Sequence, residues 1–206
     1  MRISHRILET VRRNPTSVFE LGKGQRGSNS IARNWEYKLK PFHVPGVSIG
    51  QVANTFEAYC LGAFNNNKAN LKKIGELYDR YPKYELNYQQ QNLVFQDFHK
   101  NIEFNIAGDF LLTGEIFRID RTRNGGYAIT VVWKNQESDI WAQELRFPVL
   151  QKFYADEFGV PTNKVQVGIY DFENVSHEYI SFDEESIEDA MKELQNIIKE
   201  IGAATV

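Results

Sequence analysis

The chain has 206 residues, of which 42% are hydrophobic, and this is enough apolar surface for one sizeable core with room for a small helical lobe. Its single cysteine, Cys60, excludes an intramolecular disulfide and a zinc or iron–sulfur site held by cysteines of one copy. No window of about 18 apolar residues exists to span a bilayer, and the N-terminal run MRISHRILETVRRNP lacks the apolar core of a signal peptide. We therefore expect a cytoplasmic protein without membrane contact.

The formal net charge of −3 hides an uneven distribution of charge along the chain. Residues 1–51 carry nine Lys and Arg against three acids, whereas the segment from residue 177 onward carries eight acids against two lysines. Either both runs are solvated helix faces, or the basic N-terminal part is a surface that meets phosphate. The pattern alone leaves both interpretations open.

Helical spacing of apolar residues dominates the first hundred residues. The expected helices cover residues 3–13, 47–64, 70–80 and 87–100. Ser4 is available as the N-cap of the first helix, and Asn14-Pro15 is expected to end it. The Gly-, Ser- and Asn-rich segment 21–34 that follows has no periodicity and is expected to be a loop.

From residue 102 onward the pattern becomes β-rich, with two strands punctuated by the glycine turn at Gly125-Gly126. A helix with an internal kink at Pro148 and a stop at Gly159 is expected next. Two alternating strands and a capped amphipathic helix complete the chain, at residues 164–172, 177–182 and 181–201.

This order of elements, helices and then β, β, β, α, β, β, α, indicates an α/β or α+β fold with a central mixed sheet flanked by helices. We expect residues 1–100 to form a helical region packed on an α/β core of residues 101–206, as one compact domain overall. The four histidines, His5, His43, His99 and His177, are scattered along the chain and are expected to be surface or capping residues rather than ligands.

Several stretches of the sequence resemble the RecB-type branch of the PD-(D/E)XK nuclease superfamily, which includes nuclease domains of recombination helicases and CRISPR-associated adaptation exonucleases. The N-terminal mark of that branch is a serine that opens a short helix ending at a proline before an aromatic residue, here Ser4, Pro15 and Phe19. The stretch GEIFRIDRTRNGGYAITVVWKN, residues 114–135, overlays the core hairpin of the family without gaps. The resemblance implies a restriction-endonuclease-like core.

In that family, two acids at adjacent strand ends, usually assisted by a histidine, hold Mg²⁺ or Mn²⁺, and a lysine orients water or stabilises negative charge. Carried over to this sequence, the two acids fall on Phe117 and Val132, the histidine falls at or near Gln51, and Lys134 is retained. The glutamine and aromatic residue of the family helix are Gln143 and Phe147 in one alignment. They are Arg146 and Leu150 in another with a shorter gap.

An apolar Phe117 and Val132 would displace the water that a Mg²⁺ ion keeps, so we expect no metal and no surviving catalysis. The alternative is a rearranged site of Glu115, Lys134 and Glu144, which would again hold Mg²⁺ or Mn²⁺. Lys134 also has a simple explanation, as a strand-end lysine whose ammonium reaches water or Glu115.

Three functions stay open from the sequence. The first is a catalytically degenerate nuclease-like protein that binds DNA or RNA, or serves as a subunit or scaffold in a nucleic-acid-processing or defence complex. The second is a protein-interaction or structural component, with a protein partner or a second copy of the chain, and the third is a divergent active nuclease. For the first, the candidate phosphate contacts are Arg12, Arg13, Lys23, Arg26, Arg33, Lys38, Lys40, Arg118 and Lys134.

Overall fold

The computed structural model describes residues 1–21, 30–134 and 138–204, and this part of the chain divides into two compact units. The sheet unit contains the described residues of 1–24, 93–173 and 177–206, and the helical unit those of 25–92 and 174–176. The division differs from the boundary expected at residue 100. The N-terminal segment belongs to the sheet unit because its first strand pairs with a strand from the second half of the chain.

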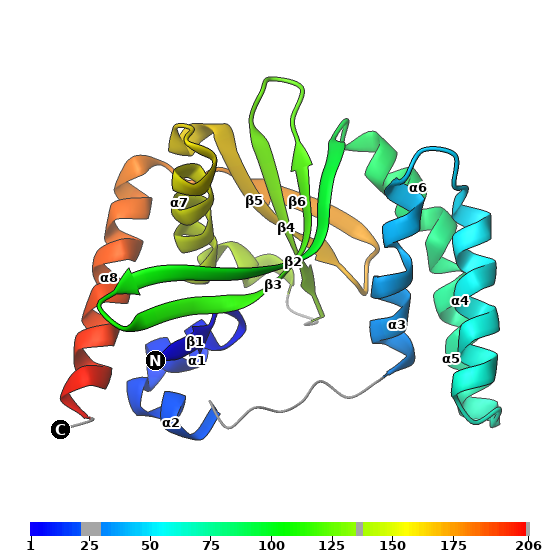
Figure 1. Cartoon of the computed structure of the whole chain (residues 1–206), viewed down its shortest axis with the longest axis horizontal. Helices are drawn as coiled ribbons and strands as arrows, with labels where there is room; N and C mark the ends of the chain where they lie inside the picture. Colours follow the sequence, from blue (N-terminus) through cyan, green and yellow to red (C-terminus); the bar gives the residue numbers. More distant parts are fainter. Residues whose placement is uncertain (22–29, 135–137, 205–206) are drawn as a thin grey trace. The chain divides into compact units, whose positions relative to one another are not determined.

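The sheet unit is built on a mixed six-stranded sheet with the order β1-β3-β4-β5-β6, and β2 pairs with the other edge of β3 (Figure 1). The strands are β1 Arg2–Ser4, β2 Val94–Ala107, β3 Phe110–Arg121, β4 Tyr127–Trp133, β5 Val165–Asp171 and β6 Ser176–Ile180. Antiparallel pairing joins β2, β3 and β4, whereas β1 runs parallel to β3 and β5 runs parallel to β4. The expected mixed sheet and the expected hairpin around the glycine turn are confirmed.

Helices of the sheet unit flank this sheet and bury its apolar face. They are α1 Leu8–Arg13, α2 Val18–Leu21, α7 Arg146–Phe158 and α8 Glu184–Ala203, with short 3-10 helices at His5–Ile7, Pro15–Ser17, Ser138–Gln143 and Thr162–Lys164. One continuous core joins residues such as Leu8 of α1, Ile129 of β4, Leu150 of α7 and Leu194 of α8. The N-cap of α8 is Asp183, whose side chain accepts a hydrogen bond from the Ser186 amide, so the expected capped helix is confirmed.

Three local expectations are wrong. The predicted helix over residues 87–100 ends at Gln90, and β2 begins at Val94, because this aromatic and polar segment pairs along β3. Pro148 causes no kink, since α7 begins at Arg146 and a proline in the first turn removes no helical hydrogen bond. The N-terminal helix starts later than expected, because residues 2–4 are a strand and Ser4 caps the turn that follows it.

The helical unit contains α3 Ile31–Lys38, α4 Ile49–Ala63, α5 Lys68–Tyr78 and α6 Arg80–Gln90, with a single turn at Lys40–His43. The helices expected over residues 47–64 and 70–80 are confirmed as α4 and α5. The fully buried Trp35 is central to this unit, with ring centroids 5.2 Å from Tyr81 and 6.0 Å from Tyr84. These aromatic residues form part of the core of the helical unit.

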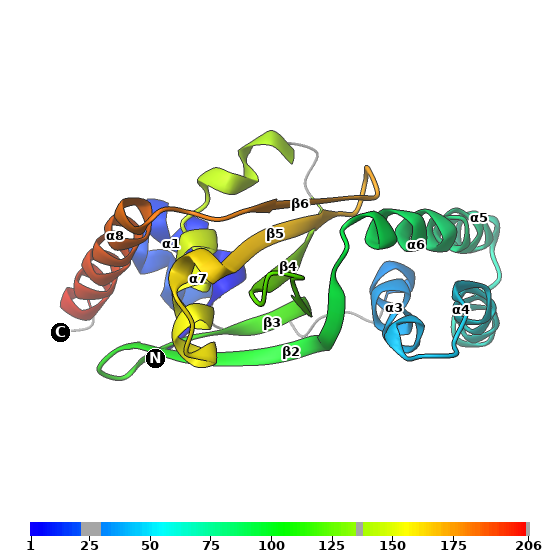
Figure 2. The same cartoon turned by 90° about the horizontal axis from the view of Figure 1, so that it is seen from above.

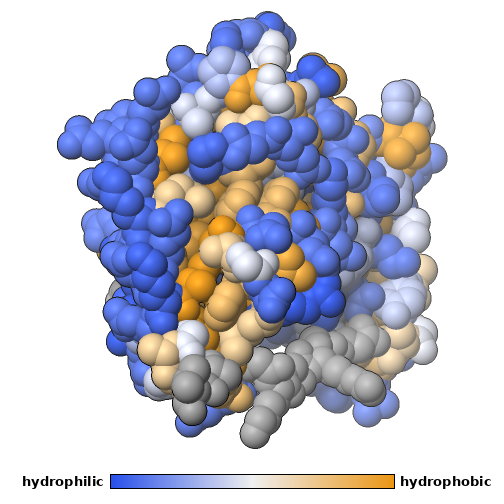
Figure 3. Space-filling view, turned by 60° about the vertical axis from the view of Figure 1, so that its left-hand side comes forward, coloured by the Kyte–Doolittle hydropathy of each residue, from blue (hydrophilic) through white to orange (hydrophobic). Residues whose placement is uncertain are grey.

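On one face of the molecule, hydrophobic side chains gather in a band (Figure 3). On the face drawn in Figure 3, hydrophobic surface (orange) is bordered by hydrophilic side chains (blue). Within the residues that the structure describes, no helix is both long and apolar enough to cross a membrane.

Candidate nucleic-acid interface and degenerate metal site

One edge of β3 is shared by two strands that do not meet. β1 pairs with residues 111–113 and β4 pairs with residues 118–121, so residues 114–117 fall between them. We call this stretch the β3 gap. Phe117, at the position of the first family acid, lies in the gap, and Val132 and Lys134 lie at the far end of β4, beyond its pairing with β3.

The His5 ring fills part of the β3 gap. Its Nε2 atom lies 3.2 Å from the Glu115 carbonyl oxygen, and because a carbonyl only accepts, Nε2 carries the proton. Gly114 has φ 143°, and a Cβ atom there would lie 2.3 Å from His5 Cδ2, so only glycine fits. The expectation of a surface histidine is wrong for His5, which is 1% exposed.

The surroundings of His5 disfavour its charged form. Burial, followed by the positive charge of Arg146, lowers the pKa of His5 to about 3, so the ring is neutral at neutral pH. The Nδ1 atom of His5 is buried without a hydrogen-bond partner among the described residues. A neutral histidine in this position releases no proton near pH 7 and adds no positive charge to the gap.

Arg146, the first residue of α7, is the buried cation of this region and is 8% exposed. Its guanidinium carbon lies 5.3 Å from the centre of the Trp133 ring, and its Nε atom forms an ion pair of 2.6 Å with Glu144 that is not aligned as a hydrogen bond. Burial lowers the pKa of Arg146, while Glu144 opposes that shift. Burial likewise raises the pKa of Glu144, against the effect of Arg146.

Phe117 belongs to an aromatic cluster rather than to a polar pocket. It is 3% exposed, and its ring centroid lies 4.7 Å from that of Phe98 and 5.9 Å from that of Tyr170, the latter in a stacked arrangement. The half-buried Val132 pairs in register with the same Tyr170. Both positions of the family acids are therefore filled by packed apolar side chains.

The remaining candidate acids are engaged at separate places. The Glu115 carboxylate lies 2.9 Å from His99 Nδ1, and Glu144 is paired with Arg146. Lys134 is exposed, with Nζ 5.6 Å from the centre of the Phe172 ring. Over residues 1–21, 30–134 and 138–204, no three His, Cys, Asp or Glu side chains come together as a metal site. The rearranged metal site thus finds no support in this part of the chain.

Gln51, at the position of the family histidine, has a local structural role. It is the third residue of α4 and forms a capping box with Ser48, in which the Gln51 amide donates to Ser48 Oγ and the Ser48 amide donates to Gln51 Oε1.

Arg118 does not contact phosphate, because it is completely buried, so this prediction is wrong. Its guanidinium forms a 2.6 Å ion pair with Asp120 and lies within hydrogen-bond distance of His177 and the Tyr179 hydroxyl, at 3.1 and 3.0 Å. Thr130 completes this network through the same hydroxyl, at 2.8 Å. His177 is 7% exposed, so the surface expectation is wrong for this histidine as well.

The other cations predicted to contact phosphate differ in their exposure and in their present partners. Arg12 is paired with both carboxylate oxygens of Glu193, at 2.6 and 3.0 Å, and ties α1 to α8. In the helical unit, Arg33 lies over the ring of Tyr37 and Lys38 over that of Tyr59, while Lys40 is exposed. Lys23 and Arg26 lie outside the described residues.

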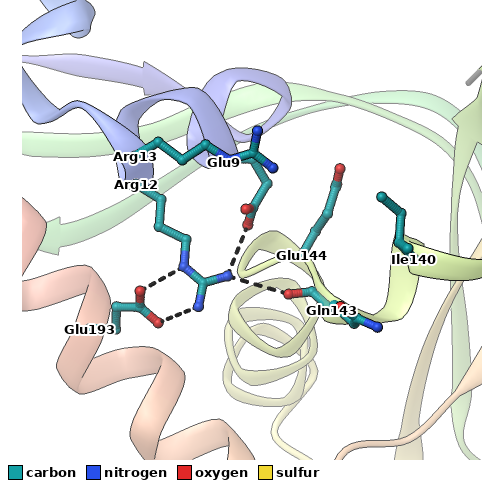
Figure 4. A pocket seen from close by; sticks show the side chains of 7 residues that line it. All are labelled: Glu9, Arg12, Arg13, Ile140, Gln143, Glu144 and Glu193. Atoms are coloured by element: carbon teal, nitrogen blue, oxygen red, sulfur yellow. Dashed lines mark hydrogen bonds and ion pairs between the residues drawn. The ribbon is translucent and has the colours of Figure 1, made fainter. Parts of the chain in front are cut away.

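Figure 4 shows the open pocket beside Arg12, with a volume of about 390 Å³. Seven residues line it: Glu9, Arg12, Arg13, Ile140, Gln143, Glu144 and Glu193. Arg13 is exposed and forms no ion pair with a described residue, and its charge lowers the pKa of Glu144 against the dominant effect of burial. Arg6 is equally exposed and unpaired within the described chain, and its charge acts on His5 and Arg146.

Three residues around the β3 gap, His5, Arg6 and Arg146, are not among the predicted catalytic or phosphate-binding residues. His5 and Arg6 follow the Ser4 cap directly, but no pattern indicates that the N-terminal strand carries them to β3. For Arg146 there was a signal, because the shorter-gap alignment puts it at the helix position of the family glutamine.

Comparisons with known proteins add little to this description. No family model and no curated protein matches the chain. A solved structure described as the crystal structure of SSO0001 is 11% identical, and the match covers 94% of this chain and 85% of that one with a TM-score of 0.31. A likeness at that TM-score carries no argument about fold or function.

Proposed function

We propose that the chain is a catalytically degenerate nuclease-like protein that binds nucleic acid within a nucleic-acid-processing or defence assembly. The arrangement of the elements supports this proposal. Antiparallel β3 and β4 are followed by α7 and by β5, which is parallel to β4. This agrees with the strand, turn, strand, helix and strand that the resemblance to the RecB-type nucleases implies.

The observation that carries the proposal is the packing of Phe117 against Phe98 and Tyr170. A metal ion that cleaves phosphodiesters needs carboxylate ligands and retained water, and this position of the chain provides neither. A degenerate nuclease is a protein that keeps the strands and helices of the nuclease fold but has lost the catalytic residues.

Binding would depend on exposed cations of the N-terminal segment. Arg6 and Arg13 are exposed and have no ion pair within the described chain, unlike Arg12 and Arg118. A phosphate contact contributes more binding free energy at an unpaired arginine than at a paired one, because no existing ion pair has to be broken. Lys40 is the corresponding exposed candidate of the helical unit.

A salt titration tests the proposal directly. We expect the affinity for a short labelled duplex to fall steeply with the logarithm of salt concentration, with a slope of about 0.9 per phosphate contact. The double variant Arg6→Glu/Arg13→Glu should bind at least about tenfold more weakly at low salt and show a smaller slope. Parallel titrations with single-stranded DNA and RNA identify the preferred nucleic acid.

The matched control is Lys199→Glu, a charge reversal at an exposed lysine of α8. It should change affinity by less than about twofold, because only the change in net charge acts on the nucleic acid. No binding of any nucleic acid at low salt, or equal losses in the control and the double variant, would refute the proposed interface.

A further inference from the structure

β2 forms one edge of the sheet and is open on its outer side. Over residues 94–107 it pairs with β3, and no other described strand pairs with it. Figure 2 shows β2 as the outermost strand on this side of the sheet. Alternate backbone N–H and C=O groups of an edge strand point away from its neighbour, so β2 offers a row of hydrogen-bonding groups to another strand.

A groove runs along this edge. It has a volume of about 510 Å³ and is lined by six consecutive residues of β2, 100–105, together with Phe153, Asp156 and Glu157 of α7. Ile102 and Phe104 supply an apolar part, and the Phe104 ring stacks on that of Phe153 at 5.0 Å. Six residues of extended chain span roughly 20 Å, so the groove has the length of a short β-strand.

The charges around this groove are mostly negative. Glu103, Asp156 and Glu157 line it, against the single cation Lys100. Each of the three acids has an ion pair at the surface: Glu103 with Arg2, Asp156 with Lys152 at 2.6 Å, and Glu157 with Lys100 at 3.0 Å. Such pairs contribute roughly 1 kcal/mol or less, so a basic ligand can compete for these carboxylates.

We infer that the outer edge of β2 binds an extended basic peptide segment of a protein partner, which adds to the sheet as a further strand. Backbone hydrogen bonds to β2 supply the affinity, and alternate apolar side chains of the peptide lie over Ile102, Phe104 and Phe153. Lysine or arginine residues between them point to the opposite face of the sheet, where Glu103 lies, and Asp156 and Glu157 of α7 attract their charge at longer range. A second copy of the chain fits less well, because its own β2 edge would bring the same acids together.

The inference is tested with fluorescein-labelled Lys-Val-Lys-Val-Lys-Val-Lys and the full-length protein. We expect saturable binding that the counterpart Glu-Val-Glu-Val-Glu-Val-Glu does not show. Successive N–H groups of a strand point to opposite edges, so only every second N–H group of the bound peptide faces β2. N-methylation of all valines and N-methylation of all lysines must therefore have different effects on the affinity. One of these two peptides should lose at least about tenfold in affinity, and the other should retain it.

On the protein, Asp156→Lys/Glu157→Lys reverses the rim of the groove and should weaken binding about tenfold or more. Glu103→Lys is a second variant, on β2 itself. The matched control is Glu188→Lys/Asp189→Lys, a pair of adjacent acids on α8 whose side chains are 72% and 68% exposed. That control should bind the peptide as the unchanged protein does.

Three results would overturn the inference. One is no binding of the basic peptide, and another is equal binding of both N-methylated peptides, since attraction of opposite charges alone would then explain the affinity. The third is a stable dimer by light scattering with β2 amides protected from hydrogen exchange in the absence of peptide, because a second copy would then occupy the edge. Nucleic-acid binding can fail without affecting any of these outcomes.

Discussion

At the scale of single residues, the surroundings of a side chain decide its role more than its type does. His5 and Arg118 are polar residues that sequence reasoning puts on the surface, yet they are 1% and 0% exposed. His5 lies against Gly114 because the glycine leaves room for the imidazole ring. Arg118 is held by Asp120, which supplies the opposite charge that a buried guanidinium requires.

The buried His5 should make the stability of the sheet unit sensitive to acid. Its pKa is lowered in the folded state, so between about pH 6.5 and 3 the unfolded chain binds more protons and the free energy of unfolding falls as pH falls. We expect the unchanged protein to lose about 1–2 kcal/mol more stability between pH 7 and 5 than His5→Gln does. Urea unfolding at both pH values measures this difference, and identical losses in the two proteins would contradict it.

At the scale of elements, a polar network joins strands of the sheet in addition to the apolar packing. Arg118 and Asp120 of β3, Thr130 of β4, and His177 and Tyr179 of β6 form one buried network. β5 lies between β4 and β6 in the sheet, so this network reaches across it. Its members come from strands that are distant in sequence, which is why no local pattern reveals it.

Removing the cation of this network, Arg118, should lower the free energy of unfolding. We expect Arg118→Met to destabilise the protein by about 3–5 kcal/mol, because the buried Asp120 would lose the opposite charge 2.6 Å away. The double variant Arg118→Met/Asp120→Asn should recover part of that loss, since the buried negative charge is removed as well. Chemical denaturation measures both, and Arg13→Met, at an exposed arginine, is the control expected to change stability by less than about 0.5 kcal/mol.

At the scale of the whole molecule, charge and fold lead to different expectations about activity. The proposed nuclease ancestry rests on the order of strands and helices in the sheet unit, whereas the positions of the family acids are occupied by Phe117 and Val132. The two candidate acids of a rearranged site, Glu115 and Glu144, are paired with His99 and Arg146. The proposal of binding without catalysis rests on this combination.

We therefore expect no cleavage of single-stranded or duplex DNA above the buffer background with Mg²⁺ or Mn²⁺, measured by gel electrophoresis over several hours. Glu115→Ala and Lys134→Ala serve as matched variants for the rearranged site. Cleavage by the unchanged protein that both variants abolish would establish an active site and contradict the prediction. Equal traces of cleavage in all three proteins would indicate a contaminating nuclease and leave the prediction standing.

The sequence by itself determined the elements whose signals are local. The hairpin around Gly125-Gly126, the capped helix α8, and the order of strands and helices after residue 102 all follow from short-range periodicity, turn residues and caps. Only the tertiary structure decided which residues meet across long stretches of chain. The pairing of β1 with β3, the placement of His5 and Arg146, the burial of Arg118 and the open edge of β2 depend on contacts between distant segments. Such contacts produce no periodic pattern in the sequence, because the two partners come together only after the chain has folded.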